Sequence, residues 1–177
     1  MIQEIAAFLK SKEKLTYVNY RGKRRNSACE WHKLRSPLLM VMRAACNELL
    51  RHLVLPSGFK NQCYRMLGVK VGKDVVIGPL VWLDPLFPEL ITLEDGVMLG
   101  SGVLISTHEF LGKKIRLGRV TIRENAIVGV KSSILSGCEI GRESVLGFMS
   151  YICKDIPAKQ FWGGVPARCI KELENED

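Results

Sequence analysis

One histidine, His108, stands apart from the other two in the chain. His32 and His52 lie in the N-terminal third, whereas His108 lies in a basic, glycine-containing stretch that interrupts an otherwise regular pattern. An imidazole has an ordinary pKa of about 6.5, so it can take up and release a proton near neutral pH. Loops that leave a rigid scaffold often carry binding and catalytic residues. Proton transfer at His108 is therefore the first chemistry that the sequence suggests.

The regular pattern is an aliphatic residue at every sixth position between residues 71 and 157. The twelve anchors of this series are all Val, Ile or Leu, namely Val71, Ile77, Leu83, Leu93, Leu99, Ile105, Ile122, Val128, Ile134, Ile140, Leu146 and Ile152. A period of six fits neither an α-helix nor a simple alternating strand. It is the repeat of a parallel β-helix, in which three such steps make one coil and residues eighteen apart stack. A β-sandwich with coincidental spacing is the alternative, which so many in-phase anchors disfavour.

Two interruptions break the period. The first adds four residues at Asp84 to Glu89, where two prolines predict a loop. The second, counted as five added residues, predicts a mobile basic loop at 107–119. Without those five residues His108 and Val130 are 17 positions apart, nearly one coil, which predicts neighbouring levels of the same wall. Val130 and Phe148 are 18 apart and should stack directly.

Composition indicates one core-forming domain with an appendage in 177 residues. No apolar run approaches the roughly 20 residues that cross a bilayer, and the N-terminus makes a poor signal peptide. We therefore expect a cytoplasmic protein. The six cysteines show no CxxC pair and no metal-ligand spacing, which favours reduced, structural cysteines and no bound metal.

The net charge of +8 is unevenly distributed. Residues 1–70 carry 14 Lys and Arg against 4 Asp and Glu, whereas residues 71–177 carry 12 against 14. Two helices are expected in the basic segment, at residues 2–9 and from Pro37 towards Pro56. The second has an apolar stripe, formed by Leu38, Leu39, Val41, Met42, Ala45, Leu49, Leu50 and Leu53.

That stripe is expected to pack on the first coil of the β-helix, whose end would otherwise be open. Peripheral membrane contact through a basic amphipathic helix is the alternative. Nucleic-acid binding is not expected, because no recognised module accompanies the charge.

The hexads, the histidine loop and the C-terminal sequence Gly163-Gly164-Val165-Pro166-Ala167-Arg168 resemble the hexapeptide-repeat acyltransferases. The galactoside, maltose and Nod-factor O-acetyltransferases are the most similar group, over roughly residues 67 to 171. The resemblance implies a left-handed parallel β-helix, mainly β, assembled as a homotrimer with acetyl-CoA between neighbouring prisms. We expect a basic N-terminal helical cap at 1–66, the β-helix at 67–157 and a C-terminal tail or helix at 158–177.

The resemblance also assigns roles to residues. It implies that His108 is the general base and that the backbone N–H of Val130 binds the oxyanion. The residues expected to contact CoA are Val130, Phe148, Cys153, Lys154, Arg168 and Lys171. Phe148 departs from the family pattern, which has a small residue there. A bulky ring at this level narrows or stacks against the pantetheine channel.

The acceptor side departs further from the family. Nothing in the first 61 residues matches the N-terminal sugar-binding motif of the sugar acetyltransferases. Asp84 is the nearest candidate for a carboxylate that binds the acceptor, with a turn-capping role as the alternative. Glu109, beside the base, either binds the acceptor or is simply exposed.

The expected function is acetyl-CoA-dependent O-acetylation of a sugar or glycan precursor. A serine O-acetyltransferase is the alternative enzyme, although the sequence shows no evident acidic partner for the base. A non-catalytic trimeric scaffold, docked through its basic segment, is the alternative without catalysis. A γ-type carbonic anhydrase is excluded because its zinc needs three histidines and the coils hold only His108.

Overall fold

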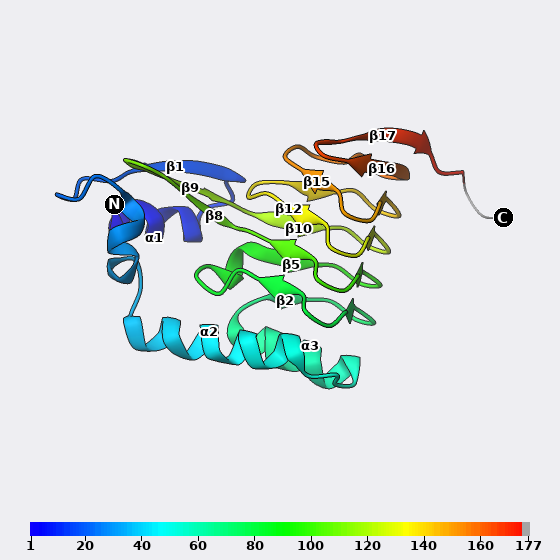
Figure 1. The fold of residues 1–177 in the computed structure, drawn as a ribbon, viewed down its shortest axis with the longest axis horizontal. Helices are drawn as coiled ribbons and strands as arrows, with labels where there is room; N and C mark the ends of the chain where they lie inside the picture. The colour runs from blue at the N-terminus through cyan, green and yellow to red at the C-terminus, as the bar shows by residue number, and fades with distance from the viewer. Residues whose placement is uncertain (175–177) are drawn as a thin grey trace.

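The computed structural model describes residues 1–174, and most of them form a parallel β-helix (Figure 1). Its short strands stack in three parallel sheets, the walls of the prism. The first wall contains β2 (Lys70–Val71), β5 (Ile91–Leu93), β10 (Val120–Ile122) and β13 (Glu139–Ile140). The second contains β3 (Val76–Ile77), β6 (Met98–Leu99), β11 (Ile127–Val128), β14 (Val145–Leu146) and β16 (Gln160–Gly164). The third contains β4 (Trp82–Leu83), β7 (Leu104–Ile105), β12 (Ser133–Ile134) and β15 (Tyr151–Ile152).

The strand register confirms the eighteen-residue coil. Val128 lies opposite Leu146, and Ile134 lies opposite Ile152. Eleven of the twelve anchors are buried, and Val71, on the first coil, is partly buried. Each anchor removes its apolar side chain from water, while the residue before it faces outward, so the interior of the prism is the core that the pattern predicts.

The second interruption is larger than the sequence count indicated. Ile105 is on the third wall and Ile122 on the next wall along the chain, so one six-residue step separates them and eleven residues are inserted. These form an antiparallel hairpin of β8 (His108–Leu111) and β9 (Lys114–Gly118). The strand β1 (Leu15–Asn19) pairs with β9. The predicted mobile loop is therefore an ordered three-stranded sheet.

The N-terminal segment does not act as one cap. Its first part, with α1 (Ile2–Lys10), β1 and the 3₁₀ helix η1 (Ser27–Lys33), lies beside the hairpin (Figure 1). Its second part, α2 (Pro37–His52) and α3 (Ser57–Leu67), covers the open end of the prism. Within α3, Lys60, Asn61 and Arg65 donate hydrogen bonds to carbonyl oxygens of the first coil. The predicted cap is thus supplied by residues 37–67 alone.

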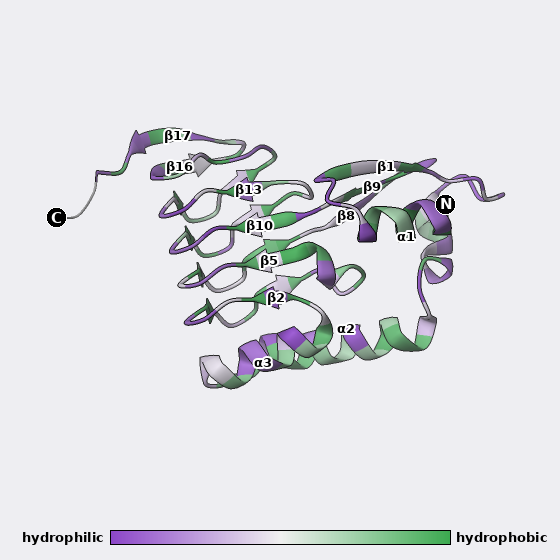
Figure 2. Cartoon of the chain, turned by 180° about the vertical axis from the view of Figure 1, so that it is seen from behind, coloured by the Kyte–Doolittle hydropathy of each residue, from purple (hydrophilic) through white to green (hydrophobic). Residues whose placement is uncertain are grey.

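The orientation predicted for α2 is wrong. Its buried residues are Met40, Asn47 and Leu50. Most of the predicted stripe faces solvent, with exposed fractions of 72% for Leu38, 61% for Val41, 56% for Met42 and 60% for Leu49. Figure 2 shows hydrophobic residues along much of this helix.

The inward face of α2 is partly polar because it meets the polar backbone of the prism end. Asn47 donates to the carbonyl oxygen of Leu83, at the edge of the first coil. Buried carbonyl groups need such partners. An edge of this kind therefore selects a polar side chain over a leucine.

The C-terminal segment forms strands, not the predicted tail or helix. β16 extends the second wall, and β17 (Ala167–Glu172) pairs with it in the antiparallel direction. Residues 175–177 of the predicted tail lie outside the described residues. Within residues 1–174, no helix is both long and apolar enough to cross a membrane. The six cysteines are free, and burial raises the pKa of Cys138 to about 11.

Candidate active site

His108 is paired with an acid that the sequence did not identify as its partner. Its Nδ1 lies 2.5 Å from Oδ2 of Asp84. Asp84 follows β4, and His108 opens β8 one coil further along the chain. Because an ionised carboxylate only accepts hydrogen bonds, Nδ1 carries the proton. The Nε2 atom is then the basic nitrogen, and it has no hydrogen-bond partner among the described residues.

Asp84 is completely buried, and other donors satisfy its remaining acceptor sites. Thr107 donates its backbone N–H and its hydroxyl to Oδ2, and the backbone N–H of Leu86 donates to Oδ1. Burial alone would raise the pKa of Asp84, but the hydrogen bonds from His108 and Thr107 hold it below its usual value. The predicted contact of Asp84 with an acceptor does not fit this geometry, because the side chain is inaccessible. Asp84 positions His108 instead.

Aromatic rings and ion pairs hold the surroundings of the imidazole. The rings of Phe87 and Phe110 contact His108 edge to face, with centroids 5.9 and 5.1 Å from its own. The loop that carries Phe87 is anchored at Glu89, which pairs with Arg35 and Arg43 from the N-terminal segment. The side chain of His108 is consequently only 16% exposed.

The structure directs Glu109 away from the base. Successive side chains of a strand point to opposite faces, and Glu109 follows His108 on β8. Its carboxylate accepts a hydrogen bond of 2.7 Å from the Ser136 hydroxyl and pairs with Arg116 at 3.3 Å. The acceptor contact predicted for Glu109 is therefore not supported by its position.

Val130 and Phe148 occupy equivalent turns on successive coils, as their spacing predicts. The N–H of Met149 donates to the carbonyl of Val130, and the Phe148 ring covers Gly129, where a Cβ atom would approach it within 2.6 Å. Phe148 is 75% exposed. Among the described residues, the backbone N–H of Val130 donates to no acceptor.

The predicted shared wall for His108 and Val130 is wrong. Val130 lies at the corner between the second and third walls, whereas His108 leaves the corner between the third and first walls. The miscounted insertion is the reason, since eleven residues, and not five, leave the coil. Within one chain, the base and this backbone donor lie at different corners of the prism.

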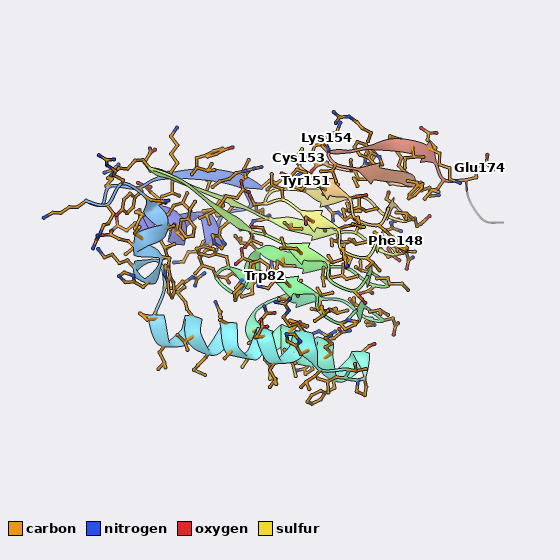
Figure 3. The ribbon with its side chains drawn as sticks, viewed as in Figure 1. Trp82, Phe148, Tyr151, Cys153, Lys154 and Glu174 are labelled. Carbon is orange, nitrogen blue, oxygen red and sulfur yellow. The ribbon has the colours of Figure 1, made fainter. Side chains whose placement is uncertain are left out.

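The predicted CoA contacts are distributed over the same two corners and the C-terminal strands. Figure 3 shows Cys153 and Lys154 together after β15, well separated from Phe148. Lys154 lies over the ring of the buried Trp162, 4.9 Å from its centroid. Arg168 and Lys171 are exposed on β17, with no ion-pair partner in the described part of the chain.

The partner of His108 and the residues around it were not predicted from the sequence. The spacing held a usable signal, because Leu83 stacks on Ile105 once the four extra residues of the first loop are counted. That alignment brings Asp84 beside Ser106 and within two residues of His108. No comparable signal marks Trp31, which reaches a cavity beside His108 from the N-terminal segment.

Within residues 1–174, no group of three or more His, Cys, Asp or Glu residues is placed to hold a metal ion. The candidate site contains the Asp84–His108 pair, whereas the backbone N–H of Val130 and the cations lie elsewhere on the prism.

A Bacillus subtilis protein described as "Putative acetyltransferase YvoF" is 32% identical over 146 residues, which cover 81% of this chain and 85% of that protein. No family model matches the sequence.

Two solved structures share the fold at low sequence identity. A hexapeptide-repeat acetyltransferase from Vibrio cholerae, complexed with acetyl-CoA, has a TM-score of 0.65 at 18% identity, over 81% of this chain and 90% of that chain. A galactoside acetyltransferase in complex with coenzyme A has a TM-score of 0.63 at 21% identity, over 78% and 82%.

Proposed function

Because this chain belongs to the hexapeptide-repeat acetyltransferase family, we propose that it transfers the acetyl group of acetyl-CoA to a hydroxyl of a sugar or glycan precursor. The observation that carries the proposal is the Asp84–His108 pair. It fixes the imidazole tautomer and leaves Nε2 as a free base in a mostly apolar setting. A general base needs this arrangement within hydrogen-bond reach of the acceptor hydroxyl.

The reaction is a proton transfer coupled to acyl transfer. Nε2 of His108 removes the hydroxyl proton while that oxygen attacks the thioester carbonyl. The backbone N–H of Val130 donates to the resulting oxyanion. Collapse of the tetrahedral intermediate breaks the carbon–sulfur bond, and the thiolate of CoA takes the proton from the imidazolium. The buried carboxylate of Asp84 stabilises that imidazolium while it exists.

The donor site is proposed to lie between copies of the chain. His108 and Val130 occupy different corners of one prism, so a base and an oxyanion donor from one copy do not meet. In a homotrimer with left-handed prisms, as the family resemblance implies, the Val130 corner of one copy faces His108 of the next. Lys154, Arg168 and Lys171 then supply cations for the phosphates of CoA.

The outer surfaces of the walls support such a ring. The outward residues of the second wall are apolar (Val76, Met98, Ile127, Val145 and Phe161), and those of the third wall are largely so (Trp82, Leu104, Ser133 and Tyr151). The first wall presents Lys70, Thr92, Thr121 and Glu139. A cyclic trimer buries two different patches of each copy, which matches two apolar walls and one polar wall.

A serine O-acetyltransferase is the second candidate, because the Asp84–His108 pair supplies the acidic partner that was not evident in the sequence. The cavity beside His108 favours it less. Its lining is almost wholly apolar, and burying the two charged groups of free serine there would cost more than burying the neutral hydroxyls of a sugar.

The test is the substitution His108→Ala, assayed by thiol release from acetyl-CoA with panels of sugars, glycolipids and serine. We expect turnover to fall about 100-fold or more. His52→Ala is the matched control, since His52 is an exposed histidine of α2, and it should keep full activity. An active His108→Ala variant would refute the assignment of the base. Serine as the best acceptor would refute the sugar assignment.

Ligand binding separates the enzyme from a non-catalytic scaffold. CoA at a hundred times its dissociation constant should stabilise the folded protein by about 2.7 kcal/mol. A scaffold without a donor site would show no thermal shift with CoA.

A further inference from the structure

A cavity of about 260 Å³ adjoins the base on the side of the N-terminal segment. Its walls include Trp31 from η1, Leu86 from the first loop and Phe110 from the hairpin, together with three residues of α2, which are Met40, Val41 and Ala44. His108 also lines it and is its only residue that can carry a charge. The cavity is therefore an apolar space next to the side chain of His108.

The lining is poorly suited to a bare sugar. Each sugar hydroxyl moved from water into such a space would lose hydrogen bonds that these side chains cannot replace. An alkyl or aryl group would instead gain from leaving water. The apolar lining of the cavity therefore favours an apolar group as its ligand.

The cavity is not closed from the surface of α2. Val41 is a lining residue and is itself 61% exposed. It belongs to the exposed apolar stripe that includes Leu38 and Met42, with exposed fractions of 72% and 56%. An apolar group longer than the cavity could continue along this stripe.

We propose that the cavity binds an apolar group carried by the acceptor, placing the acceptor hydroxyl at Nε2 of His108. The proposal rests on the acetyl transfer described above and names its substrate class, a hydroxyl compound with an alkyl or aryl substituent. Two sources share that chemistry, a small apolar aglycone and a lipid anchor. If the source is an aglycone, only the part inside the cavity is bound, so affinity stops rising once the chain is longer than the cavity. Affinity keeps rising with chain length if the stripe on α2 also takes part.

The test compares methyl, phenyl, octyl and dodecyl β-D-glucosides, each below its micelle concentration. Binding is measured without acetyl-CoA, through tryptophan fluorescence, with Trp31→Phe identifying the signal from Trp31. Each buried methylene should improve binding about fourfold, so the octyl compound should bind at least about tenfold more tightly than the methyl compound. A plateau between octyl and dodecyl indicates an aglycone, and a continued rise indicates a lipid anchor.

Two neighbouring alanines of α2 provide matched variants. Ala44→Phe fills the cavity and should weaken octyl glucoside binding at least about tenfold, whereas Ala45→Phe places the same ring outside the cavity lining and should not. The KM for octyl glucoside in acetyl transfer should follow the same order. Equal binding of methyl and octyl glucosides, or no effect of Ala44→Phe, would overturn the proposal.

The acyl chain of a longer acyl-CoA donor is the competing occupant of the cavity. If Ala44→Phe abolished the use of octanoyl-CoA but left octyl glucoside binding unchanged, the cavity would hold the acyl chain and the proposal would be wrong. Glucoside binding is measured without acetyl-CoA and does not depend on turnover. If the unmodified protein bound octyl glucoside but transferred no acetyl group to any acceptor, only the proposed function would be contradicted. The two failures are therefore distinguishable.

Discussion

The proposed site has two ends, which are built in opposite ways. The base end is His108 with Asp84, and the oxyanion end is the backbone N–H of Val130 with the neighbouring Phe148. Asp84 is completely buried, all its oxygens are bonded, and His108 is packed between two aromatic rings. At the other corner, Phe148 is 75% exposed and the N–H of Val130 has no acceptor in the described part of the chain. One end is complete within a single chain, whereas the other is open. Under the proposal above, a second copy completes the open end.

The oxyanion end can be removed without disturbing the turn that carries it. Val130 precedes Lys131, which has a φ of +57°, and an equivalent turn on the first coil has Pro79 before Leu80, with a φ of +59°. Proline is therefore compatible with this position. Val130→Pro deletes the N–H and should lower kcat about 100-fold or more.

Val130→Ala keeps the N–H and is the matched control, expected to stay within about twofold of the parent activity. Both variants should keep the thermal stability of the parent. Equal activity of the two would show that this N–H does not bind the oxyanion.

Mixing two inactive variants tests whether His108 and the Val130 N–H of one site come from different copies of the chain. Random exchange of His108→Ala and Val130→Pro chains in a trimer would leave about a quarter of the interfaces with both groups intact. Activity should return to about that fraction of the parent value. If each site is built within one chain, the mixture would stay inactive.

The base end should respond to the loss of charge at Asp84. In Asp84→Asn the imidazolium loses its buried counter-charge and the imidazole loses part of its orientation. We expect kcat to fall about 10- to 100-fold, with an unchanged KM for acetyl-CoA. The KM separates a positioning role from a general loss of structure, which would impair donor binding as well.

Asp74 provides the control for this substitution. It is an exposed aspartate in a turn with a φ of +53°, a conformation that asparagine also tolerates. Asp74→Asn should leave both kinetic constants unchanged. A comparable fall in kcat for Asp74→Asn would mean that the effect at Asp84 is not specific.

The smallest expected effects are at the three exposed cations. Single substitutions of Lys154, Arg168 and Lys171 by alanine should each raise the KM for acetyl-CoA about five- to tenfold, since each removes one charge-assisted contact. Repeating the measurement with 3′-dephospho-CoA identifies the cation that meets the 3′-phosphate, because its substitution then has no further effect. Lys12→Ala, an exposed lysine near the N-terminus, should change neither constant.

Much of the fold was predictable because each coil is specified by a short repeat of neighbouring residues. Each anchor, such as Val128 or Ile134, repeats the same requirement for an inward aliphatic side chain. The interruptions were located correctly for the same reason. Their lengths were less certain, because a count of residues does not say on which wall the chain resumes.

By itself, the sequence determined the parallel coils, the interior anchors and the place of His108, since all three follow from a six-residue period and its breaks. Only the tertiary structure decided which acid meets His108, because that pairing depends on stacking two coils across the insertions. It also decided which face of α2 is buried. The polar end of a prism selects hydrogen-bond donors, and that requirement overrides the apolar stripe of the helix.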